Sequence, residues 1–154
     1  MKKIILVVVC CLCLCGCGNS NKKLDIKSIE TSLKQISEIS DTCIVTEEND
    51  PNGQLNKEGG YIEALFFKHT NLETDSTKDA CQDGTSAGGS IEIYKNANDA
   101  EQRNEYLSKF DGGFLSDFHQ VDGTIVVRIS NGLTASEQKV LYNEIIDKIH
   151  STNW

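Results

Sequence analysis

Apolar and polar residues alternate along this chain with periods that predict both helices and strands. From Leu24 to about Ser40, apolar residues recur at spacings of three and four, which is one stripe of an amphipathic helix: Ile29, Leu33, Ile36 and Ile39. A strand is predicted at Thr42–Glu47. The clearest strand is predicted at Tyr61–His69, where Leu65 and Phe67 make the second face apolar as well, as expected of a central strand.

The last third of the chain predicts a second group of elements. A strand ends near Ile93 and a helix follows it, and two further strands are predicted at Phe114–Val121 and Thr124–Ser130. Asp122-Gly123 between them is a signal for a two-residue hairpin turn. With a final helix, the order is α-β-β-β-α-β-β-α. We therefore expect a single small α+β domain, with a mainly antiparallel sheet of about 4–5 strands and about three helices on one face.

Two similar segments are predicted to open the last two helices. Ile93–Arg103 aligns without gaps with Ile129–Lys139. Within them, Asn98 and Thr134 are each followed three residues later by a glutamate, so each is predicted to be the N-cap of a capping box. A duplicated strand–helix unit and independent helix-start chemistry explain this likeness equally well.

The beginning of the chain has the three parts of an export signal. Lys2 and Lys3 precede an apolar run from Ile4 to about Leu14, and small residues follow. A run of about eleven apolar residues is too short for a membrane span, which needs roughly 20 residues of helix. We therefore expect a leader that is removed on export.

The end of this leader carries a specific motif. Leu14-Cys15-Gly16-Cys17 resembles the lipobox of bacterial lipoproteins, in which an aliphatic residue and two small ones precede the modified cysteine. The resemblance implies a diacylglyceryl group on the Cys17 sulfur and cleavage between Gly16 and Cys17 by signal peptidase II. Cys15 is a rival site because Leu12 precedes it by three residues, but the bulky Leu14 directly before it disfavours that choice. A plain secretory signal is the other alternative.

The lipobox resemblance implies a division of the chain and a location. Residues 1–16 would be the signal peptide, residues 17–23 the lipidated cysteine and a short polar tether, and residues 24–154 an extracytoplasmic α+β domain. Fatty-acyl chains such as palmitate would hold the protein on the extracytoplasmic face of the cell membrane. Four phrases of this domain also resemble small uncharacterised lipoproteins of Gram-positive bacteria, which implies no particular activity: Glu47–Asn52, Gly59–Tyr61, Gly88–Tyr94 and Leu133–Gln138.

Charge and cysteine content narrow the function classes. Without the leader, 13 basic and 23 acidic residues leave a net charge of −10, which disfavours binding to nucleic acid. Four of the seven cysteines belong to the leader and Cys17 is the expected lipid site, so Cys43 and Cys81 remain. Two thiols in an exported chain favour one disulfide. Two buried, unpaired thiols are the alternative.

Few residues suggest catalytic or metal chemistry. Glu48, Asp50 and Asn52 have the first half of an EF-hand spacing, but Gly59 stands where the bidentate glutamate is required, so they are weak candidates for an irregular calcium site. No cofactor is expected. His69 and His119 are the only plausible general bases.

Arg128 interrupts the apolar strand near the end of the chain, and we expect it to face solvent rather than to bind an anion. The leading hypothesis is a membrane-anchored, non-enzymatic module that binds an unknown protein or small ligand. The alternative is a small, hydrolase-like extracytoplasmic enzyme that uses His69 and His119. A pocket that holds both histidines together with carboxylates would favour the enzyme.

Overall fold

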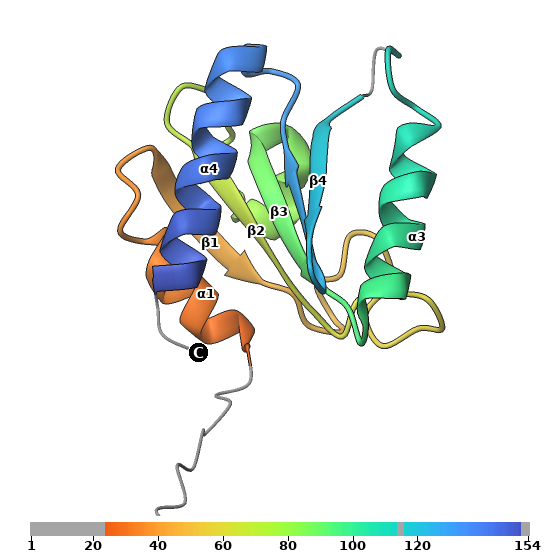
Figure 1. Cartoon of the computed structure of the whole chain (residues 1–154). Helices are drawn as coiled ribbons and strands as arrows, with labels where there is room; N and C mark the ends of the chain where they lie inside the picture. The colour runs from red at the N-terminus through yellow and green to blue at the C-terminus, as the bar shows by residue number, and fades with distance from the viewer. Residues whose placement is uncertain (1–23, 114–115, 152–154) are drawn as a thin grey trace, which may run out of the picture.

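A computed structural model describes residues 24–113 and 116–151 (Figure 1). Cys17, the rest of the predicted leader and the tether lie outside the described residues. The elements follow one another as α1 (Ile26–Leu33), β1 (Ile39–Ile44), β2 (Glu63–His69), α2 (Ala80–Asp83), the 3-10 helix η1 (Thr85–Ala87), β3 (Gly88–Ile93), α3 (Ala97–Ser108), β4 (Phe118–Asp122), β5 (Ile125–Ile129) and α4 (Ala135–Ser151).

The five strands form one sheet in the order β1-β2-β3-β5-β4, and every neighbouring pair is antiparallel. The register of the three central strands aligns Leu65 of β2 with Ile91 of β3, and Ile91 with Val127 of β5. Side chains alternate between the two faces along each strand, and residues paired across neighbouring strands point to the same face. Leu65, Ile91 and Val127 therefore lie on one face of the sheet. The predicted α+β class and the single small domain are confirmed.

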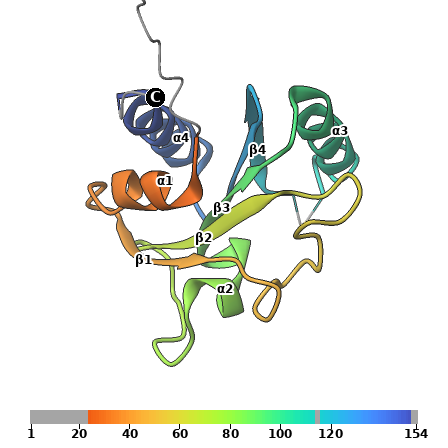
Figure 2. The same ribbon diagram turned by 90° about the horizontal axis from the view of Figure 1, so that it is seen from below.

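Helices cover both faces of this sheet, so the expectation of helices on one face is wrong. α1 and α4 pack on the face that carries Leu65 and Phe67, whereas α2 and α3 lie on the face that carries Ala64 and Phe66 (Figure 2). The physical reason is the composition of β2, whose alternate residues are apolar on both sides. Each apolar face must be buried by its own layer.

Several elements differ in extent from the prediction. α1 ends at Leu33 rather than near Ser40, and β1 begins at Ile39. Ile36 lies in the turn between them and is 1% exposed, so it joins the core without being helical. The segment between β2 and β3, for which no element was predicted, contains α2 and η1, which adds a fourth α-helix.

Of the two predicted helix caps, one is wrong and one is confirmed. α3 is capped by Asn96, whose side-chain oxygen accepts a hydrogen bond from the Asp99 amide at 3.0 Å, so the prediction of Asn98 is wrong. Asn98 lies inside the first turn and faces solvent. At the start of α4 the capping box is confirmed. The Thr134 amide donates to Glu137 Oε2 at 2.8 Å, and the Glu137 amide donates to Thr134 Oγ1 at 3.3 Å.

Within residues 24–113 and 116–151, no helix combines the length and the apolar character that crossing a membrane requires.

Candidate functional site

A buried carboxylate lies at the centre of the sheet face that α3 covers. Glu92 is only 1% exposed, although its neighbours Ile91 and Ile93 pack into the opposite core. Arg103 of α3 binds it through two hydrogen bonds, with Nε 3.0 Å from Oε2 and Nη2 3.2 Å from Oε1. Such a two-bonded pair fixes both position and orientation of the guanidinium.

Arg128, the second of the chain's two arginines, belongs to the same cluster. Its Nη1 lies 3.5 Å from Glu92 Oε1, and its Nη2 donates to Asp117 Oδ2 at 2.7 Å. The side chain of Arg128 is 14% exposed, so the expectation that it faces solvent is wrong. The register of β3 and β5 pairs Val126 with Glu92 and thereby makes Arg128 its diagonal neighbour on the same face.

Two buried tyrosines connect this cluster to the loop before β2. The Tyr94 hydroxyl donates to Glu92 Oε2 at 2.7 Å, and burial together with the charge of Glu92 raises the pKa of Tyr94. The Tyr61 hydroxyl donates to Asp50, and burial and that carboxylate raise the pKa of Tyr61. The two rings meet edge to face, with centroids 6.5 Å apart. Both phenols are therefore fixed hydrogen-bonding groups rather than proton-transfer groups.

A cleft of about 510 Å³ opens beside this cluster, between the loop before β2 and α3. The loop contributes Asn52, Gln54, Gly59 and Gly60, and the opposite wall consists of Tyr94, Gln102, Arg103 and Tyr106. Among these lining residues none carries a carboxylate. The cleft therefore differs from a domain surface that is acidic overall.

The shape of the loop wall depends on two of its residues. Asp50 accepts hydrogen bonds from the Asn52 amide at 3.0 Å and the Leu55 amide at 2.8 Å, in addition to the Tyr61 hydroxyl. Gly60 lies so close to the chain that an added Cβ would be 2.0 Å from the Gln54 carbonyl oxygen. The loop wall is thus held from inside and is not an open, extended segment.

These contacts also involve the weak calcium candidates. Both Asp50 oxygens are engaged within the loop and with Tyr61. Burial would raise the pKa of Asp50, but its hydrogen bonds outweigh burial and the pKa is lowered. Asp50 therefore organises the turn that contains Asn52, and neither Glu48 nor Asp50 belongs to the closely spaced group of His, Cys, Asp or Glu ligands found in the described residues.

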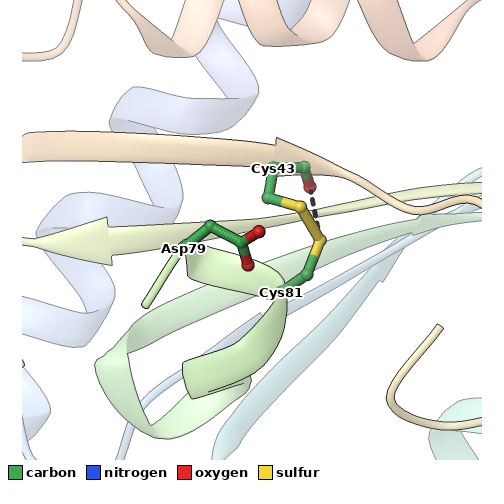
Figure 3. Close-up of side chains that lie close together, drawn as sticks. All are labelled: Cys43, Asp79 and Cys81. Carbon is green, nitrogen blue, oxygen red and sulfur yellow. Dashed lines mark hydrogen bonds between the residues drawn. A yellow bond between two sulfur atoms is a disulfide. The ribbon is translucent and has the colours of Figure 1, made fainter. Parts of the chain in front are cut away.

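One group of potential ligands does lie close together in the described chain: Cys43, Asp79 and Cys81. Cys43 and Cys81 are joined by a disulfide, with Cα atoms 5.5 Å apart, which ties β1 to α2 (Figure 3). Sulfurs in a disulfide are not thiolates and cannot serve as the usual metal ligands. Asp79 is then the one ligand left, and it caps α2 through the Gln82 amide at 2.9 Å.

The two candidate histidines lie on opposite faces of the sheet. His69, at the end of β2, lines a pocket of about 210 Å³ next to α4, together with Glu38 and Glu137. Burial lowers the pKa of His69, and the two carboxylates partly offset this effect. His119 of β4 faces α3, where Nδ1 lies 2.6 Å from Asn104 Oδ1. No common site contains both histidines within the described residues.

The cleft beside α3 was not anticipated from the sequence. Glu92 is the only charged residue of β3, and the chain has only two arginines, Arg103 and Arg128. A buried acid needs a cationic partner, so these three residues could have been paired as a hypothesis. The amides that line the cleft carry no comparable signal, because asparagine and glutamine are common in surface loops.

Comparisons with known proteins identify no relative from which a function could be transferred. No protein-family model, no curated protein and no solved structure matches this chain.

Proposed function

We propose that this protein is an extracytoplasmic lipoprotein, anchored through Cys17, whose α+β domain binds a ligand in the cleft between residues 52–60 and α3. The lipobox resemblance supports the anchor. The observation that carries the binding site is the pair of bonds from Glu92 to Arg103, which holds one wall of a 510 Å³ cleft in a fixed orientation. Prearranged polar groups around a concave surface are the usual mark of a ligand site.

The chemistry of the lining favours binding over catalysis. The described residues around the cleft offer amides, phenols and a guanidinium, and no serine, cysteine, histidine or carboxylate is among them. General acid–base and nucleophilic catalysis most often use such groups, placed within hydrogen-bond reach of the substrate. The separation of His69 and His119 on opposite faces removes the geometric support for the alternative enzyme.

The anchor is tested with two cysteine variants in intact cells. We expect Cys17→Ser to release the protein from the membrane fraction and Cys15→Ser, the matched control, to leave it there. Mass spectrometry of the membrane-bound protein should find a mature N-terminus at Cys17 with a diacylglyceryl mass. Membrane retention of Cys17→Ser, or release by Cys15→Ser alone, would contradict the proposed anchor.

The binding site is tested by photo-crosslinking of the full-length protein on living cells. A photoreactive residue is placed at Gln54 or Gln102 in the cleft, or at Val140, which is 63% exposed on α4 and serves as the control. We expect adducts from the two cleft positions, and their loss when Tyr106→Ala is added. Equal adduct yields at all three positions, or none from the cleft, would reject this site.

A further inference from the structure

We infer that the cleft binds a carbohydrate, namely an uncharged, hydroxyl-rich sugar chain. This inference rests on the proposed function, because it identifies the ligand class of the same cleft. It follows from three features: the amide groups of the lining, the balanced charge of Arg103 and the held ring of Tyr106.

The amides suit hydroxyl groups. Asn52, Gln54 and Gln102 line the cleft, and each carries an acceptor oxygen and an NH₂ donor; the Gln54 NH₂ also donates to the Asn52 carbonyl at 3.4 Å. A sugar hydroxyl likewise donates one hydrogen bond and accepts others, so neighbouring hydroxyls can pair with both ends of a planar amide.

The charges around Arg103 disfavour an ionic ligand. Its Nε and Nη2 already donate to Glu92, so one of the two edges on which a guanidinium binds a carboxylate or phosphate with two bonds is occupied. Any anion that reached the remaining Nη1 would approach Glu92 as well. A cation would gain nothing either, because none of the described lining residues is acidic. An uncharged ligand is not repelled by Glu92 and does not need an acidic residue in the lining.

Tyr106 supplies an apolar surface at the mouth of the cleft. Tyr106 is 49% exposed, and its ring contacts Arg103 with Cζ at 5.7 Å, Lys109 with Nζ at 5.8 Å and Phe110 at a centroid distance of 5.3 Å. A tyrosine ring combines an apolar face with a polar tip. It can therefore pack against the C–H face of a sugar ring with little further loss of side-chain freedom.

A peptide is the main competitor, because backbone amides would also pair with Asn52 and Gln54. Peptide recognition, however, draws its specificity from pockets for side chains. The described lining offers no aliphatic side chain to form such a pocket. This difference favours the sugar chain.

The test uses the mature, full-length protein in detergent, labelled with ¹⁵N. The probes are three uncharged sugar chains (chitotetraose, maltotetraose and cellotetraose) and tetraglycine with both ends blocked as the uncharged peptide. We expect at least one of the three glycan probes to shift the backbone amides of Gly59 and Gly60 and the side-chain amides of Gln54 and Gln102. Tyr106→Ala and Gln102→Ala should each weaken binding about tenfold or more, whereas Tyr106→Phe and the distant Val140→Ala should not.

The outcomes separate the ligand class from the site. If tetraglycine shifts these amides and no glycan probe does, the carbohydrate assignment is overturned and the proposed binding site stands. The same holds if no probe binds while crosslinks from Gln54 and Gln102 persist on cells after the glycan is digested. If the crosslinks are missing too, both proposals fail.

Discussion

Glu92 and Arg103 form a two-bonded ion pair that joins the centre of the sheet to α3, with donor–acceptor distances of 3.0 and 3.2 Å. The carboxylate also accepts a hydrogen bond from the Tyr94 hydroxyl and faces Arg128, so one buried group orients residues from α3, from β5 and from the connection between β3 and α3. The stability of this face and the shape of the cleft therefore depend on the same side chain.

Replacing Glu92 should cost far more stability than replacing either arginine alone. Glu92→Leu removes the carboxylate that two largely buried guanidinium groups share, and leaving a buried charge unpaired costs about 3–5 kcal/mol. Arg103→Met should cost less, because Arg128 still faces Glu92. The free energy of unfolding in urea measures both. A loss below about 1 kcal/mol for Glu92→Leu would show that this cluster does not hold the face together.

The Cys43–Cys81 disulfide should make a large contribution to stability. It closes a loop between residues 38 positions apart, and the chain-entropy model assigns about 4 kcal/mol to a loop of this length. We expect the double variant Cys43→Ala/Cys81→Ala to unfold at a clearly lower urea concentration. Alkylation of the folded protein without reductant should leave both cysteines unlabelled. Labelling of both would mean that the thiols are free, as in the alternative that the sequence leaves open.

The central strands could be predicted because alternation of apolar residues is visible within one short segment. The cluster at Glu92 could not, because its residues are distant in the sequence. The alternation around Leu65 and Phe67 suffices to place β2 in the middle of a sheet. That Arg128 lies beside Glu92 depends on the register between β3 and β5, whose residues are distant in the sequence. A lone arginine in a strand usually faces solvent, so nothing local distinguishes Arg128 from that common case.

The predicted helix boundaries were wrong for a related reason. Ile36 and Ile39 continue the helical stripe of α1, but the chain turns after Leu33 and both residues still pack against the same core. The apolar pattern indicates which residues are buried, but a helix and a helix followed by a turn can both bury the same residues. At α3 the glutamate three residues after Asn98 suggested a capping box, while the structure places Asn96 at the cap.

The position of this cap gives a direct comparison of two asparagines. Asn96→Ala should destabilise the protein by about 1 kcal/mol, because the Asp99 amide loses its side-chain acceptor. Asn98→Ala should change stability by less than about 0.5 kcal/mol, since Asn98 is exposed within the first turn and alanine is a better helix former. Thermal unfolding of the two variants side by side measures the difference. The reverse order would restore Asn98 as the cap.

His69 should make the stability of the folded state fall between about pH 7 and pH 5. Burial lowers its pKa, while Glu38 and Glu137 oppose this effect in part. An unfolded histidine has a pKa of about 6.5, so the unfolded chain takes up the proton more readily than the folded one. The contribution of His69 is therefore present above about pH 6.5 and is lost as the pH falls through its lower folded pKa.

A hydrogen bond to the His69 ring also favours its neutral form. Nδ1 of His69 accepts a hydrogen bond from the Asn71 amide at 3.1 Å, and a protonated ring could not accept it. His69→Asn should thus flatten the dependence of unfolding free energy on pH in this range. His150→Asn, which alters an exposed histidine paired with Asp122, is the control. The carboxylates with lowered pKa values, such as Glu137, lose their contributions at lower pH, near the ordinary range of about 4 and below. Parallel curves for the wild-type protein and His69→Asn between pH 7 and 5 would contradict a neutral, buried His69.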